Sequence, residues 1–162
     1  MKVKEIMTSD AKVCAPTNSL AEVARLMWED DCGMLPVINS DGKVGGVITD
    51  RDVCMAAFTK GQRLFEIAVE DVISARDTFT CNGEDDILSA LETMQVNQVR
   101  RLPVIKEDGI LEGVLSMNDV VLNAEESKEK KKADLSYSDV VNAYKSICEH
   151  RVPTRVKAMA RG

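Results

Sequence analysis

The chain has 162 residues, of which 44% are hydrophobic but only 4% aromatic, so it can bury one ordinary core packed mainly by aliphatic side chains and methionine. Its net charge of −6 argues against nucleic-acid binding, which needs a basic face. It contains neither an apolar run of the ~18 residues that cross a bilayer nor a signal peptide, so we expect a cytoplasmic protein with no nucleic-acid or membrane partner.

The first sixty residues predict a β-α-β-β-α unit. In chain order we expect an extended segment at 12–15, a helix at 20–31, strands at 34–39 and 43–49, and a helix that begins at Asp50 or Asp52. The first helix has Ser19 as its N-cap, Glu22 completes a capping box, and apolar residues recur at helical spacing. An Asp-Gly pair lies between the two strands and favours a hairpin, because these residues tolerate positive φ.

The same pattern returns downstream, so the chain consists of two copies of one unit. Twelve of the forty aligned positions are identical between 14–53 and 81–120. They include the Leu-Pro-Val-Ile strand and the Asp-Gly turn, and short entry segments at 3–7 and 69–73 also resemble one another. The second copy predicts an extended segment at 78–81, a helix capped by Asp86, strands at 102–106 and 110–116, and a closing helix around Asp119.

Each copy places a hydroxyl residue at a strand tip and an aspartate three positions later. These residues are Thr49 and Asp52 in the first copy, and Ser116 and Asp119 in the second. Such a group presents a hydroxyl, backbone N–H groups and a carboxylate, which suit a phosphate and vicinal ribose hydroxyls. The same residues are favourable helix caps, and for one copy alone the cap is the better interpretation. Their duplication in matched surroundings favours a binding site.

The rest of the chain predicts a charged linker and one helix. Residues 125–132 form a mixed charge run typical of a solvated segment, and the basic end at 151–157 is expected to be loosely ordered. Residues 138–148 predict an amphipathic helix that uses Val140, Val141, Tyr144, Ile147 and Cys148. The five cysteines and the single histidine lack zinc-ligand spacing, and no nucleophile lies beside a recognisable base. We therefore expect neither a metal site nor an enzyme.

The tandem unit resembles a CBS-domain pair, or Bateman module. The resemblance rests on the Leu-Pro-Val-Ile strand, the Asp-Gly turn and the hydrophobic-hydrophobic-Thr/Ser-x-x-Asp motif, and it covers about residues 1–123. It implies an α/β (α+β) fold of two β-α-β-β-α repeats related by pseudo-two-fold symmetry, plus a C-terminal helical tail. We divide the chain into repeat one with its linker (1–66), repeat two (67–124), and the charged linker and tail (125–162).

The resemblance implies that the module binds AMP, ADP or ATP, as well as NAD or S-adenosylmethionine in some members. Asp52 and Asp119 would hold ribose hydroxyls, and Thr49 and Ser116 would contact ribose or phosphate. The candidate phosphate ligands are Arg51, Arg100 and Arg101, because the two copies carry arginines at different positions. The candidate base contacts are Val13, Cys32, Gly33, Met34, Pro36, Thr80, Val99 and Pro103. Many nucleotide-binding members have glycine where this chain has Cys32 and Val99.

Two functions fit these observations. The first is an adenine-nucleotide-binding regulatory module that acts on an unidentified partner protein through ligand-dependent conformation or assembly. The second is a structural module with empty clefts that dimerises and docks through its helices. Retention of the Thr/Ser-x-x-Asp frame in both copies favours the first function. The resemblance also implies a homodimer that pairs helix face to helix face.

Overall fold

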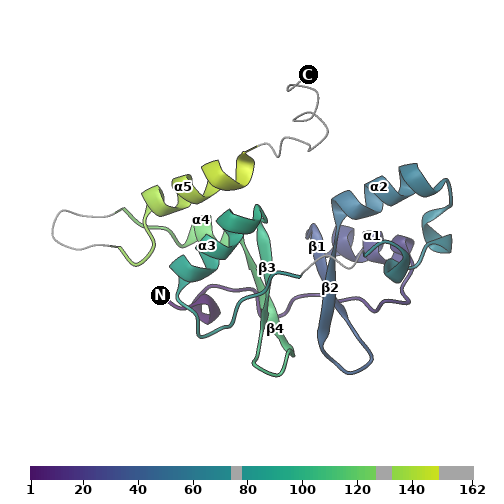
Figure 1. Cartoon of the computed structure of the whole chain (residues 1–162), viewed down its shortest axis with the longest axis horizontal. Helices are drawn as coiled ribbons and strands as arrows, with labels where there is room; N and C mark the ends of the chain where they lie inside the picture. Colours follow the sequence, from purple (N-terminus) through teal and green to yellow (C-terminus); the bar gives the residue numbers. More distant parts are fainter. Residues whose placement is uncertain (74–77, 127–132, 150–162) are drawn as a thin grey trace, which may run out of the picture.

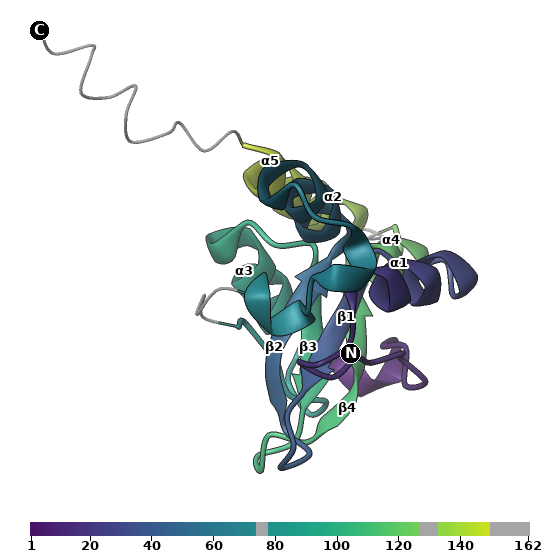
Figure 2. The ribbon, with the colours of Figure 1, turned by 90° about the vertical axis from the view of Figure 1, so that its right-hand side faces the viewer.

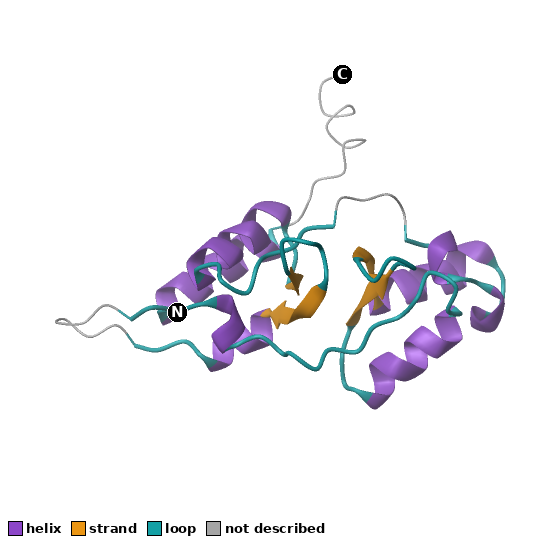
Figure 3. Cartoon of the chain, turned by 90° about the horizontal axis from the view of Figure 1, so that it is seen from below, coloured by secondary structure: helices purple, strands orange, loops and turns teal. Residues whose placement is uncertain are grey.

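The computed structural model describes residues 1–73, 78–126 and 133–149, and it confirms an α+β fold with two repeats and a C-terminal helix. Repeat one contains α1 (Leu20–Glu29), β1 (Met34–Ile38), β2 (Val44–Thr49) and α2 (Asp50–Lys60). Repeat two contains α3 (Ile87–Asn97), β3 (Arg101–Ile105), β4 (Leu111–Ser116) and α4 (Met117–Leu122), and α5 (Tyr137–Cys148) follows it. The two hairpins lie at the centre of the molecule, with helices at both ends (Figure 1 and Figure 3).

The two hairpins have the same register. Met34 lies opposite Thr49 in the first, and Arg101 lies opposite Ser116 in the second. Both ladders also shift register at the same place, between the valine and the isoleucine of the Leu-Pro-Val-Ile strand. The glycines of the two Asp-Gly turns have φ of 83° and 85°, a region that glycine adopts without steric penalty. The predicted hairpins are therefore confirmed, with strand ends within one residue of their expected positions.

Helix α1 begins where the sequence predicts and ends earlier. The Ser19 N–H donates to the Glu22 carboxylate at 2.7 Å, and the Glu22 N–H donates back to the Ser19 hydroxyl, so the predicted capping box is present. The helix ends at Glu29 because Asp31 has a φ of 47°, in the left-handed region that stops a helix. In repeat two the Asp86 side chain caps α3, as predicted.

Each repeat is completed by the segment that precedes the other repeat. The short 3₁₀ helix η1 (Val3–Glu5) packs into the core of repeat two, where Val3 is fully buried and its N–H donates to Asp85 O at 3.0 Å. The 3₁₀ helix η3 (Val69–Asp71) packs into the core of repeat one in the same way, after η2 (Leu64–Glu66). The boundary at 66/67 therefore separates two sequence copies but not the two cores.

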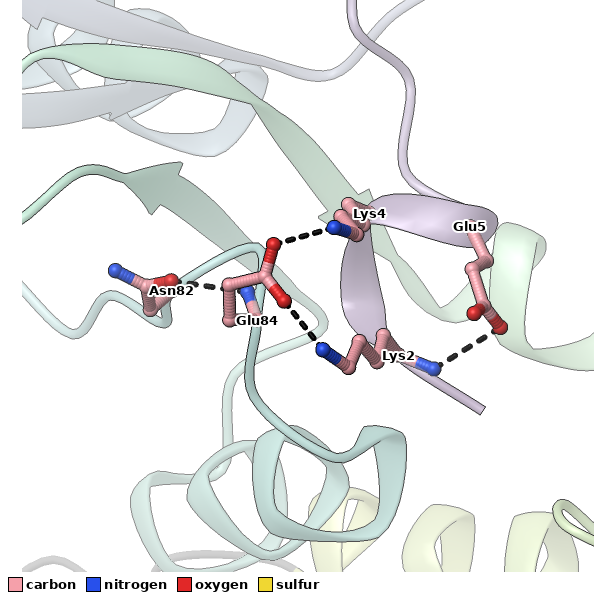
Figure 4. A network of polar contacts seen from close by, with 5 residues as sticks. All are labelled: Lys2, Lys4, Glu5, Asn82 and Glu84. Atoms are coloured by element: carbon pink, nitrogen blue, oxygen red, sulfur yellow. Dashed lines mark hydrogen bonds and ion pairs between the residues drawn. The ribbon is translucent and has the colours of Figure 1, made fainter.

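The N-terminal segment is also held to repeat two by charge and by close packing. Lys2 and Lys4 each contact one oxygen of the Glu84 carboxylate (Figure 4). Hydrogen bonds from these two lysines lower the pKa of Glu84 to about 2. Thr8 then pairs with β4, where a methyl group at Gly113 would lie 2.5 Å from Thr8 O. Glycine is required at this position because the backbone of the N-terminal segment passes directly over it.

Helix α5 belongs to the core of repeat two. It lies against α3 and α4 (Figure 1). Val140, Ala143 and Ile147 are buried in the same cluster as the apolar residues of those two helices. The cap of α5 is a third Thr/Ser-x-x-Asp box, in which the Ser136 hydroxyl donates to Asp139 Oδ2 at 2.6 Å.

The predicted apolar face of α5 is correct in part. Val140, Tyr144 and Ile147 face the protein, but the expectation is wrong for Val141 and Cys148, which are exposed. Ala143 takes the buried position, because it lies one turn from both Val140 and Ile147. Most of the charged run (127–132) and the basic end (151–157) lie outside the described residues.

Candidate functional site

In repeat one, Thr49 and Asp52 form a capping box where β2 ends and α2 begins. The Thr49 hydroxyl donates to Asp52 Oδ2 at 2.7 Å, and the Thr49 N–H donates to the same oxygen at 3.0 Å. The Asp52 N–H donates back to the Thr49 hydroxyl at 3.2 Å. Both residues are half-buried where β2 ends and α2 begins. The structure thus confirms that these residues cap α2.

Repeat two forms the same cap where β4 meets α4. The Ser116 hydroxyl and N–H donate to Asp119 Oδ2 at 2.6 and 2.8 Å, and the Asp119 N–H donates back at 3.3 Å. Ser116 and Asp119 are half-buried, like their counterparts in repeat one. The two halves of the molecule therefore present the same polar groups in the same arrangement.

Each cap leaves part of its carboxylate available. Both side-chain oxygens of Asp52 and Asp119 can accept hydrogen bonds, but the caps use Oδ2 alone. Over the described ranges, no hydrogen bond uses Oδ1 of either aspartate. A carboxylate oxygen has two lone pairs, so Oδ1 can accept from neighbouring ribose hydroxyls while Oδ2 holds the backbone. Capping and ligand binding are compatible, because they use different oxygens.

A third extended segment lies beside each hairpin. Cys14 exchanges two backbone hydrogen bonds with β1, at 3.0 and 2.8 Å, and Cys81 exchanges two with β3, at 3.1 and 2.9 Å. The extended segments expected at 12–15 and 78–81 are thus reduced to one bridged residue each. They place Val13 and Thr80, two candidate base contacts, next to the strands that carry Pro36 and Pro103.

The candidate base contacts differ in exposure. Val13 is exposed, Gly33 and Thr80 are half-buried, and Met34, Pro36 and Pro103 are buried. Cys32 packs against the core of repeat one and Val99 against the core of repeat two. Burial raises the pKa of the Cys32 thiol. Cys32 also lines a hollow between helices α1 and α2. The structure therefore exposes Val13, leaves Gly33 and Thr80 partly accessible, and packs Cys32 and Val99 against the cores.

The arginines are distributed unequally between the repeats. Arg51 and Arg100 are exposed, whereas Arg101 is half-buried and reaches from β3 to repeat one. A methyl group at Gly33 would lie 3.1 Å from Arg101 Nη2 and 2.8 Å from Asp50 Oδ2, so both charged groups approach this glycine closely. Among the described residues, no ion pair involves any of these three arginines. Their guanidinium groups remain available to an anion.

Asp50 is part of this site, and the sequence analysis did not identify it. Its Oδ1 accepts from the Arg51 N–H at 2.7 Å, and its Oδ2 faces Gly33 beside Arg101. The equivalent residue in repeat two is Met117, which is buried. In the sequence Asp50 lies at the start of a helix, where an acidic residue is favourable for the helix alone, so nothing distinguished it as a ligand contact.

The described residues offer little reactive chemistry. No group of three or more His, Cys, Asp and Glu residues among them is placed to hold a metal ion. Burial raises the pKa of Cys14 to about 11 and that of Cys81 to about 12, so both thiols are protonated and unreactive near neutral pH. None of the described helices is both long and apolar enough to cross a membrane.

Two β-α-β-β-α repeats with matched caps define a tandem-repeat module, and comparison with known proteins gives its family. The family model for the CBS domain matches residues 3–58 and 69–126, so the chain belongs to the CBS domain family. The crystal structure of CBSX2 in complex with AMP is similar over 75% of this chain and 93% of that chain, with 27% identity and a TM-score of 0.65.

Curated relatives show the same repeats in proteins of different sizes. An uncharacterized 17.7 kDa protein of Acidianus ambivalens is 35% identical over 119 residues, which are 74% of this chain and 70% of that protein. A homoserine O-acetyltransferase of Methanohalobium evestigatum is 31% identical over 118 residues, 73% of this chain but only 23% of the enzyme. The family match of this chain is to CBS domains alone, with no catalytic family indicated.

Proposed function

We propose that this protein is a regulatory module that binds an adenine nucleotide at the strand tips of its repeats and performs no reaction itself. The paired cap carries this proposal, because Asp52 and Asp119 each hold the backbone with Oδ2 and keep Oδ1 for a ligand. The AMP complex of CBSX2 supports the ligand class. ADP, ATP, NAD and S-adenosylmethionine carry the same adenosine group and are the ligands to compare with AMP.

The cap and the arginines would recognise different parts of the nucleotide. Oδ1 of each aspartate accepts from ribose hydroxyls, and the hydroxyls of Thr49 and Ser116 lie at the same edge. The guanidinium groups of Arg51 and Arg101 bind phosphate, because a guanidinium donates two parallel hydrogen bonds to phosphate oxygens. The adenine ring would lie against the strand edges at Val13 and Thr80.

The two sites are unequal in this proposal. The repeat-one side has Arg51 on α2 and receives Arg101 from β3. The equivalent positions for repeat two are Asn118 and Met34, which carry no charge. A phosphorylated ligand therefore binds more tightly on the repeat-one side, and the difference increases with the number of phosphate groups.

Regulation requires that the nucleotide prefer one state of the protein over another. A ligand shifts a conformation or an assembly only as far as its affinities for the two states differ. A nucleotide that contacts both Arg51 of repeat one and Arg101 of repeat two spans the two repeats. It would thereby fix their relative position for a regulated partner protein.

Calorimetry and thermal unfolding with AMP test the proposal. Asp52→Asn and Asp119→Asn keep an oxygen that can cap the helix but replace the ribose-facing oxygen with an N–H₂ donor. Each change removes a charge-assisted hydrogen bond worth about 1.5–3 kcal/mol, so we expect the affinity of the altered site to fall by at least about tenfold. ADP, ATP, NAD and S-adenosylmethionine are measured in parallel to identify the preferred ligand.

The chain supplies a matched control for these variants. Asp139→Asn changes the same kind of capping aspartate in α5, away from the repeats' strand tips, and should leave AMP affinity unchanged. Saturating a site on the folded protein must raise its melting temperature. A wild-type protein whose melting temperature no adenine ligand raises at millimolar concentration refutes the proposal and supports the ligand-free structural module instead.

A further inference from the structure

A single side chain of repeat two holds the end of α5. This helix packs in the groove between α3 and α4, where the side chains of the three helices share one buried cluster. Gln98, which follows α3, donates from Nε2 to Ser146 O at 3.2 Å and to Glu149 O at 3.0 Å. The C=O groups in the last turn of a helix lack partners within it, so a side-chain donor placed there stabilises the helix end.

Gln98 lies in a turn that both repeats contain. Its φ of 52° is in the left-handed region, which residues other than glycine seldom adopt, and the equivalent residue of repeat one, Asp31, has a φ of 47°. Asp31 is exposed and negatively charged, and a negative charge is unfavourable at the C-terminal end of a helix. The shared turn therefore suits a docked helix in repeat two and not in repeat one.

The residues that follow Gln98 lead directly to Arg101, the candidate phosphate ligand that approaches repeat one. Beyond Gln98, the Val99 N–H donates to α3 at 3.1 Å, and Arg100 O accepts from the Met117 N–H at 2.9 Å. The Met117 side chain is 2% exposed and lies in the cluster that includes α5. Helix α5 thus supports this segment at two places, directly at Gln98 and through Met117 at Arg100.

The phosphate site also lies beside the start of a helix of repeat one. Arg101 approaches Gly33 next to Asp50, the first residue of α2. Helices α2 and α5 lie on the same side of the two hairpins (Figure 1 and Figure 2). A ligand at Arg101 therefore contacts the beginning of one of these helices and the segment that holds the end of the other.

We propose that Gln98 and α5 position the segment that carries Arg101, and that nucleotide binding and the docking of the end of α5 strengthen each other. This inference rests on the proposed function and adds the element of the chain that responds to the ligand. A phosphate bound to the Arg101 guanidinium restricts the segment, which keeps the Gln98 amide on the carbonyl groups of α5. By linkage, the docked helix end raises the affinity for the phosphate by the same factor. Gln98 is a positioning residue, because it acts on the ligand through Arg101.

Calorimetry with AMP and with adenosine tests the inference on the full chain. Gln98→Asn shortens the side chain by one CH₂ group, so its amide no longer reaches α5, while asparagine still tolerates the left-handed conformation. We expect the affinity for AMP to fall by about fivefold or more. The affinity for adenosine, which has no phosphate for Arg101 to bind, should change by less than about twofold.

The chain offers a matched control on the same helix. Gln95→Asn makes the same chemical change one turn earlier in α3, at a side chain that forms no hydrogen bond to α5 within the described part of the chain. It should leave both affinities unchanged. Equal losses of AMP and adenosine affinity in Gln98→Asn would indicate a general loss of structure and would overturn the inference.

Hydrogen exchange reports on the helix end itself. Saturating AMP should slow the exchange of the backbone amides in the last turn of α5 in the wild type, but not in Gln98→Asn. Without ligand, Gln98→Asn should speed exchange both in that turn and at residues 99–101, because the Gln98 amide joins the two segments. A change confined to the last turn of α5 contradicts the positioning role.

The same measurements separate this inference from the proposed function. A wild-type protein that binds AMP with no change of exchange in α5 contradicts the inference and leaves the nucleotide site intact. A protein that binds no adenine ligand, but in which Gln98→Asn still speeds exchange in both segments, contradicts the nucleotide and supports the positioning role of Gln98. Absence of both effects overturns both.

Discussion

The packing of α5 predicts that one substitution in this helix destabilises repeat two as a whole. Ile147 is 7% exposed and lies in the cluster that joins α3, α4 and α5. Ile147→Ala removes three carbon atoms, each worth about 0.8 kcal/mol of transfer free energy. The cavity adds to this cost, and the position near the end of α5 allows some relaxation. We therefore expect the free energy of unfolding to fall by about 3 kcal/mol, within the usual range of about 2–5 kcal/mol.

Urea unfolding followed by circular dichroism measures this effect. Val141→Ala is the control on the same helix, because Val141 is 53% exposed and should change the free energy of unfolding by no more than about 0.5 kcal/mol. In a thermal scan, Ile147→Ala should lower the melting temperature by about 6–12 °C for a chain of this size. The slope of the urea transition should not change, since both proteins expose nearly the same surface.

One outcome would contradict cooperative unfolding of α5 with repeat two. A helix that is only appended to repeat two would lose its own structure at low urea in Ile147→Ala, and the main transition would stay where it is in the wild type. Such a result would show that α5 does not unfold cooperatively with the core, and that the α3–α4 face can be uncovered at little cost.

Two further measurements test the buried thiols and the N-terminal ion pairs. Iodoacetamide should modify the exposed Cys54 and Cys148 and spare Cys14 and Cys81, because burial raises the pKa of these two thiols to about 11 and about 12. Mass spectrometry of the labelled native protein measures this, and equal labelling of all four cysteines would contradict it. Glu84→Gln should lower stability at neutral pH and low salt, because the two lysine partners lower the pKa of Glu84 from 4.5 to about 2. The wild type should have the higher free energy of unfolding above pH 4.5, and this difference should disappear as the pH falls toward 2. A difference that stays constant between these pH values contradicts the role of the ion pairs.

Structural features formed by residues close together in the sequence were predictable. The capping boxes at Ser19, Thr49 and Ser116 each involve only four residues, so the sequence contains every participating group. The turn glycines follow from the positive φ that an Asp-Gly hairpin requires. Periodic apolar positions identified the buried face of α1, because one side of the helix must pack on its hairpin.

Contacts between segments that are far apart in the sequence were not predictable in this way. The Val3 N–H donates to Asp85 O, 82 positions along the chain, and nothing in the local sequence of Val3 distinguishes packing on repeat two from packing on repeat one. On α5 the pattern showed an apolar face but not its centre, because Val141 and Ala143 are both apolar and the packing partner decides which is buried. The approach of Arg101 to Gly33 depends on the contact between the two hairpins, which leaves no periodic signal.

One position shows a clear chemical difference between the two repeats. In repeat two Met117 lies under α5, whereas in repeat one the equivalent residue is Asp50. A helix docked over α1 and α2 in the manner of α5 would bury the Asp50 carboxylate, whose one hydrogen bond among the described residues comes from the Arg51 N–H. Burying a carboxylate that is not fully hydrogen-bonded costs several kcal/mol, on the order of 5. Any partner of this face must therefore bring a hydrogen-bond donor to Asp50. The apolar face of α5, formed by Val140, Ala143 and Ile147, provides no such donor, so this helix suits the groove that contains Met117 and not the one that contains Asp50.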